Sequence, residues 1–161
     1  MKSAPDNSRL GQERRRKRFP RALALVLCLA FGLGLYSEWL GRQAGSAYPP
    51  RGEFHQLAKG RLHYRDIRPE GASVGTIVLV HGAWSGHADL LSALAPALRN
   101  HRVIAVDRPG EGWSERLGDS QMASPARQAE AIMQLLDAVA PERFVLVAHS
   151  LGAPLSAHIA L

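Results

Sequence analysis

The chain has 161 residues, of which 46% are hydrophobic and 21% are charged, with a formal net charge of +6. The excess of positive charge lies entirely in residues 1–21, because residues 22–161 carry equal numbers of basic and acidic side chains. This distribution argues against a nucleic-acid-binding face, and the single cysteine, Cys28, excludes an intramolecular disulfide and a CxxC metal site.

The first predicted element is an apolar helix near the N-terminus. The basic cluster RRRKR at 14–18 precedes the uncharged run ALALVLCLAFGLGLY at 22–36. Continued to Leu40, this segment would be a helix of about 28 Å, close to the thickness of a bilayer core. The sequence predicts residues 1–21 as a basic cytoplasmic tail and 22–40 as a transmembrane signal anchor, with the rest periplasmic or extracellular. A cleaved signal peptide, which would release a secreted protein, stays open because small residues at 44–47 could serve a peptidase.

After the apolar segment, residues 41–53 are rich in glycine and proline and are predicted to be a linker. From Phe54 onward the pattern alternates between strands and helices. Strands are predicted at 60–67, 75–82, 101–107 and 143–150, the first as an edge or half-exposed strand and the others as buried strands. This alternation predicts an α/β fold with an open, mostly parallel sheet.

Two helices are expected between the buried strands, at 87–100 and from Pro125 to Pro141. Pro96 is expected to kink the first of them. Apolar residues at helical spacing predict the sides that face the core: Leu90, Leu91, Leu94 and Leu98 on the first, and Ala129, Ile132, Met133, Leu136 and Val139 on the second.

The last predicted strand runs directly into VAHSLG, where Ser150 stands between the small residues Ala148 and Gly152. A turn from a strand straight into a helix holds its central residue in a sparsely populated backbone conformation and exposes its side chain. Small residues are needed two positions to either side because strand and helix nearly touch there. The following helix also directs free N–H groups at a developing oxyanion. The stretch therefore predicts a nucleophilic serine at Ser150.

Two further loops follow the other buried strands, HGAWSG at 81–86 and DRPGEGWS at 107–114. The carboxyl ends of parallel strands share one edge of a sheet, so all three loops are expected to meet. Gly82 allows the backbone to approach a ligand closely, and the Ala83 N–H could be an oxyanion donor beside that of Leu151. A simple strand-to-helix turn remains the alternative for the first loop.

Taken in order, the three motifs resemble the α/β-hydrolase superfamily over about residues 54–161. HGAW resembles its oxyanion loop, DRPGEGWS its D-x-x-G-x-G-x-S loop, and AHSLG its nucleophile elbow. The resemblance implies that Ser150 is the nucleophile and that Ala83 and Leu151 supply oxyanion N–H groups. It also implies residues that shape the loops, namely His81, Gly82, Asp107, Gly110, Gly112, Ala148 and Gly152, and pocket or packing roles for Trp84 and Trp113.

The residue type at position 150 narrows the expected chemistry. Members of the superfamily that open epoxides or displace halide resemble each other in using a carboxylate nucleophile, whereas a serine indicates acyl transfer. We therefore expect a membrane-anchored serine hydrolase, esterase- or lipase-like, that acts on a small ester or acyl substrate through an acyl-enzyme. Neither a metal nor an organic cofactor is expected, and the expected partners are the substrate and a lipid bilayer, not nucleic acid.

A serine nucleophile needs a general base and an orienting acid, which in this superfamily follow the serine in the chain. No acidic residue follows Ser150, and His158 is the only later histidine, two helical turns away. His149, the neighbour of Ser150 in the sequence, is expected to point away from the serine. The sequence therefore predicts the amino-terminal part of a hydrolase domain, either a fragment or a truncated gene product, with little activity by itself. A non-catalytic or vestigial binding module of the same fold, anchored to the membrane, is the alternative.

Overall fold

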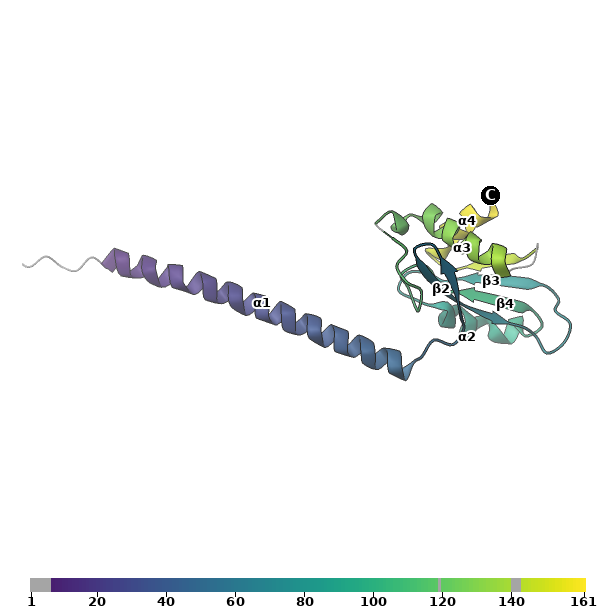
Figure 1. The fold of residues 1–161 in the computed structure, drawn as a ribbon, viewed down its shortest axis with the longest axis horizontal. Helices are drawn as coiled ribbons and strands as arrows, with labels where there is room; N and C mark the ends of the chain where they lie inside the picture. Colours follow the sequence, from purple (N-terminus) through teal and green to yellow (C-terminus); the bar gives the residue numbers. More distant parts are fainter. Residues whose placement is uncertain (1–6, 119, 140–142) are drawn as a thin grey trace, which may run out of the picture. The chain divides into compact units, whose positions relative to one another are not determined.

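The computed structural model describes residues 7–118, 120–139 and 143–161, with side chains from Ala22 onward. The chain divides into two compact units, Met1–Pro49 and Pro50–Leu161. The first unit contains one continuous helix, α1 (Asn7–Ala47; Figure 1). This helix extends well into the segment that was expected to be a linker, because residues 41–47 contain no proline to interrupt it.

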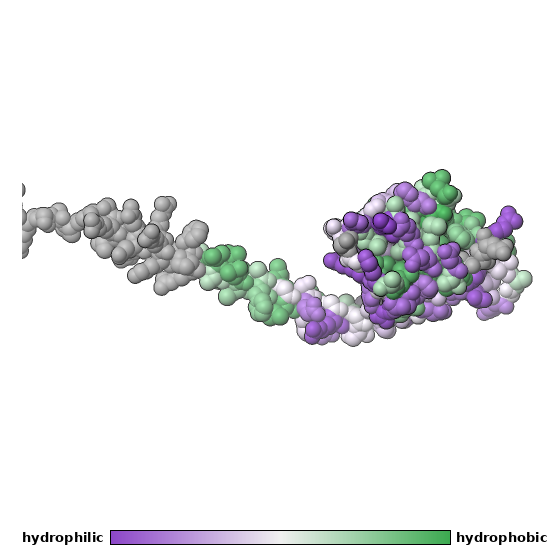
Figure 2. All heavy atoms as spheres, turned by 45° about the horizontal axis from the view of Figure 1, so that its top comes forward, coloured by the Kyte–Doolittle hydropathy of each residue, from purple (hydrophilic) through white to green (hydrophobic). Residues whose placement is uncertain are grey.

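Within α1, the stretch Ala22–Ala47 is long and apolar enough to cross a membrane, a property that it shares with signal sequences. Figure 2 shows the hydrophobic side chains along this stretch in green. A helix that is apolar on every side normally lies in a membrane or a buried core. Its large apolar residues are exposed around the whole helix, including Leu23, Leu25, Val26, Leu27, Leu29, Phe31, Leu33 and Leu35.

The second unit is built on a five-stranded sheet with the order β1-β2-β4-β3-β5. The strands β1 (Glu53–Leu57) and β2 (Gly60–Ile67) are antiparallel, and β2 is also antiparallel to β4 (Arg102–Val106). In contrast, β3 (Thr76–Val80) lies parallel between β4 and β5 (Val145–Ala148). The predicted α/β fold with an open, mostly parallel sheet is confirmed.

Helices cover both faces of the sheet (Figure 1). On one face, α2 (His87–Leu98) packs its four predicted leucines against Ile77, Leu79, Val103 and Ala105. On the other face lie α3 (Pro125–Val139) and α4 (Gly152–Ala160), with the short 3-10 helix η1 (Ser120–Ala123) before α3. Every residue of β3 is buried between these layers, and burying one large aliphatic side chain contributes roughly 1.5–3 kcal/mol. The strand β3 is thereby a rigid support for the loop that follows it.

Three sequence predictions about the core were wrong, the first of them in part. The strand β2 was predicted as an edge or half-exposed strand; it is partly exposed, but it is not at the edge, because β1 (EFHQL), which the sequence pattern did not reveal, pairs with its outer side. The strand β5 is only partly buried, since it ends the sheet order and Val145 is 61% exposed. Met133 is 40% exposed, because the buried side of α3 is formed instead by Gln128, Ala129, Ala131, Ile132, Leu135 and Leu136. Pro141, expected to end this helix, lies outside the described residues.

Candidate active site

The three predicted loops leave the same edge of the sheet. Val80, the last residue of β3, is paired with Val106 of β4 and with Ala148 of β5. His81, Asp107 and His149 therefore begin their loops side by side at the carboxyl ends of three neighbouring strands. This is the edge at which open α/β sheets bind ligands.

Ser150 occupies a strained turn between β5 and α4. Its φ is 51°, in the left-handed region that non-glycine residues rarely adopt, and its side chain is exposed. Gly152 makes the turn possible, because a Cβ there would overlap the Val80 carbonyl oxygen and lie 2.8 Å from that of His81. Strand and helix thus come together closely enough to force the serine outward.

The loop after β3 touches this turn. A Cβ at Gly82 would lie 3.0 Å from His149 Nδ1 and 3.1 Å from Ser150 Cβ, which is tighter than ordinary contact. Ala83 follows directly and is exposed. Over the described ranges, the backbone N–H groups of Ala83 and Leu151 donate no hydrogen bond to the protein. Two free donors therefore flank the serine.

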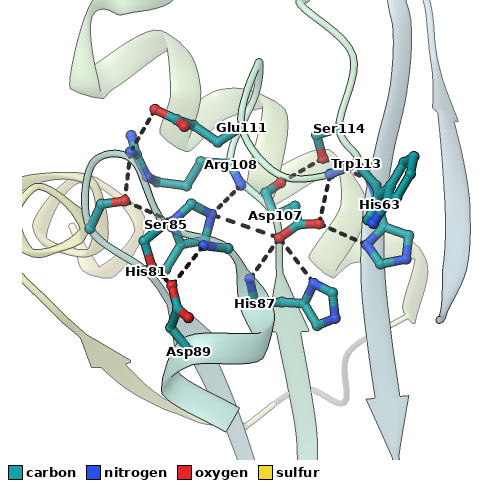
Figure 3. A network of polar contacts seen from close by, with 12 residues as sticks. His63, His81, Ser85, His87, Asp89, Asp107, Arg108, Glu111, Trp113 and Ser114 are labelled. Atoms are coloured by element: carbon teal, nitrogen blue, oxygen red, sulfur yellow. Dashed lines mark hydrogen bonds and ion pairs between the residues drawn. The ribbon is translucent and has the colours of Figure 1, made fainter. Parts of the chain in front are cut away.

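Asp107, the first residue after β4, is fully buried and is the centre of a polar cluster (Figure 3). Its Oδ1 accepts from the His87 backbone N–H at 2.6 Å and from His87 Nδ1 at 3.0 Å. Its Oδ2 accepts from His63 Nδ1 at 2.9 Å and from the Trp113 backbone N–H at 3.0 Å. Each carboxylate oxygen thus has one backbone donor and one imidazole donor.

The remaining residues of the D-x-x-G-x-G-x-S motif close this loop around the aspartate. Gly112 has a φ of 52° and lies against the Asp107 carboxyl, where any Cβ would overlap it. Gly110, with a φ of 80°, turns the loop beforehand. Ser114 Oγ donates to the Asp107 carbonyl oxygen at 2.7 Å and accepts from the His63 N–H at 2.8 Å. The motif therefore holds its own loop and fastens it to β2.

The Asp107 carboxyl remains ionised in this setting. Burial by itself raises its pKa, but the hydrogen bonds from His63, His87 and the Trp113 backbone outweigh that effect and hold the pKa well below its usual range. His63, His87 and Asp107 also present ligand atoms within 4.8 Å of one another, as a metal site would. Since both Asp107 oxygens already accept two donors, a cation would have to displace the imidazole hydrogen bonds, and these bonds explain the cluster without a metal.

His81 and Arg108 join the first loop to the second. His81 Nε2 accepts from the Arg108 backbone N–H at 3.0 Å, while His81 Nδ1 donates to the Gly82 carbonyl oxygen at 2.7 Å. The ring is therefore neutral, and burial lowers its pKa. Sequence patterns pointed to neither Arg108 nor the partners His63 and His87. The only available signal was a charged residue two positions after a buried strand, as at Arg108.

The neutral ring of His81 predicts an acid-sensitive fold. Because burial lowers the pKa of His81 from its ordinary 6.5, the unfolded chain binds a proton that the folded chain resists. The free energy of unfolding should fall as the pH drops below about 6.5, by up to about 1.4 kcal/mol per pH unit for this proton. Urea titrations between pH 4.5 and 7.5 measure how steeply the free energy of unfolding depends on pH. His81→Gln should weaken this dependence, whereas His158→Gln, at an exposed position, should not. Equal pH dependence in the wild type and both variants would refute the neutral state of His81.

Other residues considered from the sequence lie apart from this centre. Trp84 has a φ of 58° and is 96% exposed, so it packs against nothing in the described chain, while Trp113 is partly buried. His149 and His158 are exposed. Within residues 50–118, 120–139 and 143–161, no imidazole or carboxylate forms a hydrogen bond with the Ser150 hydroxyl. The described site therefore has an exposed serine in a strained turn and two backbone N–H groups without a protein acceptor, but no base in contact with the serine.

Comparison with known proteins adds two kinds of similarity. The model of the Alpha/beta hydrolase family matches residues 77–161. Among curated proteins, RutD of Variovorax paradoxus (strain S110), whose name proposes carbamate hydrolysis as its activity, is 38% identical over 104 residues. These cover 62% of this chain and 37% of RutD.

Solved structures show the same fold. Cfl2 from Burkholderia cenocepacia aligns with a TM-score of 0.59 and 26% identity over 67% of this chain and 35% of Cfl2. A proline iminopeptidase-related protein from Thermus thermophilus aligns with a TM-score of 0.60 and 26% identity, over 68% of this chain and 39% of that protein. The N-acyl homoserine lactonase AidH, solved with N-butanoyl homoserine, aligns with a TM-score of 0.57 and 27% identity, over 66% of this chain and 39% of AidH. The chain spans little more than a third of the length of these proteins.

Proposed function

The chain belongs to the alpha/beta hydrolase family, and from this membership we propose that it carries the nucleophile and oxyanion donors of a serine hydrolase. The proposed reaction is hydrolysis of a small ester or related acyl bond through an acyl-enzyme at Ser150. The observation that carries the proposal is the left-handed backbone of Ser150 between a strand and a helix. Such strain, together with exposure at a ligand-binding edge, is typical of a nucleophilic serine at a strand-to-helix turn.

In the proposed mechanism, Ser150 Oγ attacks the acyl carbon and passes its proton to a base. The carbonyl oxygen becomes an oxyanion that accepts hydrogen bonds from the Ala83 and Leu151 N–H groups. Collapse breaks the bond to the leaving group, which takes up the proton, and water then releases the acyl group and restores the serine. We assign the base and its acid partner to a part of the protein outside the described residues, because no described imidazole contacts Ser150.

The relatives favour a small acyl compound as substrate. Their names include a lactonase solved with an acyl homoserine and a proposed carbamate hydrolase. Lactones, esters and carbamates share an acyl carbon that an alkoxide can attack with expulsion of an oxygen or nitrogen leaving group. A compound of this class is the substrate proposed for the whole protein.

We further propose that α1 anchors the protein in a membrane through residues 22–40, with the basic N-terminal tail in the cytoplasm. The support is the exposed apolar surface of the stretch Ala22–Ala47 and the basic cluster at 14–18. The intact mass of the mature protein distinguishes this arrangement from a cleaved signal peptide. A mass that includes residues 14–18 supports the anchor, and their loss supports secretion.

A fluorophosphonate probe tests the proposed nucleophile in the full-length protein. The wild type should incorporate the probe, and Ser150→Ala should not, because the probe forms a covalent bond only with an activated serine. Ser92→Ala removes an exposed serine on α2 and should leave labelling unchanged. A folded wild-type protein that takes up no probe would contradict the proposal.

That negative result would favour a second candidate, a non-catalytic binding module of the same fold. The observation behind it is the lack of any described imidazole in contact with Ser150. Such a module would bind an acyl compound at the same edge without turning it over. Saturable binding of a lactone or ester with no probe incorporation would support this alternative.

A further inference from the structure

Arg108 is a buried cation whose contacts lead to the first loop rather than to a close ion pair. Its side chain is 1% exposed. Arg108 Nη1 donates to Gln128 Oε1 at 2.9 Å, and Nη2 donates to the Gly82 carbonyl oxygen at 2.9 Å. The carboxylate of Glu111 lies 3.6 Å away and is partly exposed (Figure 3). An ion pair of this length with a partly exposed carboxylate compensates only in part for burying the guanidinium, so the two hydrogen bonds to neutral acceptors are the main contacts that hold Arg108.

The Gly82 carbonyl oxygen is the point at which Arg108 acts. It accepts from Arg108 Nη2 at 2.9 Å and from His81 Nδ1 at 2.7 Å. A carbonyl oxygen has two lone pairs, and these two donors use both of them. Any rotation of this peptide breaks two hydrogen bonds in a buried environment, where unpaired groups are costly. The peptide between Gly82 and Ala83 is therefore locked.

The locked peptide also carries the Ala83 N–H. No described peptide bond is cis, and a trans peptide holds its N–H and its C=O on opposite sides. Since the Gly82 oxygen points inward to the buried guanidinium, the Ala83 N–H points away from it. At this position the loop lies close to the turn at Ser150, because a Cβ added at Gly82 would come within 3.1 Å of Ser150 Cβ.

We propose that Arg108 is a positioning residue, which fixes the Gly82–Ala83 peptide so that the Ala83 N–H faces the oxyanion formed at Ser150. The inference rests on the proposed function of Ser150. Arg108 touches no reacting atom and acts only through the peptide. Its charge also polarises the carbonyl group and thereby strengthens the N–H on the other side of the same amide as a donor.

The test compares Arg108→Met and Arg108→Lys with Arg102→Met in the full-length protein. Arg102 is a matched control, because it is mostly buried, pairs with Asp66 and donates to the Val139 carbonyl oxygen, but lies at the other end of β4. We expect Arg108→Met to lower kcat for a p-nitrophenyl ester about tenfold to 100-fold with KM unchanged, less than the loss of an oxyanion donor itself. Arg108→Lys keeps one donor, so its kcat should lie between those of the wild type and Arg108→Met. Arg102→Met should lower stability and leave kcat unchanged.

A second readout does not depend on activity. The NMR order parameter of the Ala83 amide should fall from about 0.85 to below 0.6 in Arg108→Met and stay high in Arg102→Met. An ordered Ala83 amide in Arg108→Met would overturn the inference, as would equal losses of kcat in both methionine variants. If the wild type takes up no fluorophosphonate, the proposed function fails, while the order parameter still decides whether Arg108 fixes the peptide. If Arg108→Met does not fold, Arg108→Lys decides between the same outcomes.

Discussion

Asp107→Asn should lower the free energy of unfolding by about 3 kcal/mol, the cost of leaving buried donors without an acceptor. The two Asp107 oxygens accept four hydrogen bonds, and each oxygen has one backbone donor. An asparagine must place its NH2 group on one of the two sides. In either orientation it faces a backbone N–H, of His87 or of Trp113, that cannot reverse. No rotamer of the substituted side chain can therefore satisfy the cluster.

Urea unfolding followed by near-UV circular dichroism measures this loss in the full-length protein. Asp89→Asn is the matched control, because Asp89 lies in the first turn of α2 but is exposed, and within the described residues it accepts only from Ser85 and the Gly86 N–H. Its cost should not exceed about 1 kcal/mol, as for other helix N-terminal carboxylates. Equal small effects of both substitutions would show that the Asp107 cluster does not support the fold.

Gly152→Val should lower the free energy of unfolding as much as Asp107→Asn does, because of a steric clash rather than the loss of hydrogen bonds. The new Cβ would overlap the Val80 carbonyl oxygen and approach that of His81 to 2.8 Å. Both obstacles are backbone atoms of β3 and of the loop that follows it, so neither can move aside as the end of a side chain would. We expect a loss of about 3 kcal/mol or more, at the upper end of overpacking effects. Because α4 must shift away from β3, Ser150 should also lose its strained position.

Two measurements on the same protein test this expectation, the free energy of unfolding and the rate of fluorophosphonate labelling. Gly71→Val is the control, since a Cβ at Gly71 meets nothing within 4 Å. It should change neither quantity appreciably. A Gly152→Val protein with wild-type stability and labelling would mean that the close approach at Gly152 is not required.

Much of the fold could be predicted because its central strands are short, apolar and bounded by turn residues. The strands at 76–80 and 102–106 are buried on both faces and therefore appear in the sequence as continuous apolar runs. The strand β1 has no such run, because four of its five residues face solvent or are half-buried. Its pairing depends on the short turn into β2, and patterns of apolar residues do not report such pairing.

In the candidate site, too, the features set by local sequence could be predicted, and those set by contacts between distant segments could not. The strained turn at Ser150 and the close approach at Gly152 were predictable, since a strand that turns directly into a helix imposes local demands on size and backbone conformation. The cluster at Asp107 was not, because His63 reaches it only through the antiparallel pairing of β2 with β4. The proposed role of Arg108 likewise depends on a contact with Gly82, in the loop after the neighbouring strand β3. Contacts between segments far apart in the chain have no local pattern that would reveal them.

The proposal that Ser150 becomes acylated is tested most directly by trapping the intermediate. The full-length protein is mixed briefly with p-nitrophenyl butyrate, quenched with acid, digested and analysed by mass spectrometry. The mechanism predicts a butyryl group on the peptide that contains Ser150, at the serine itself and absent from Ser150→Ala. Hydrolysis of the ester with the acyl group on another residue, or with Ser150 never modified, would contradict it.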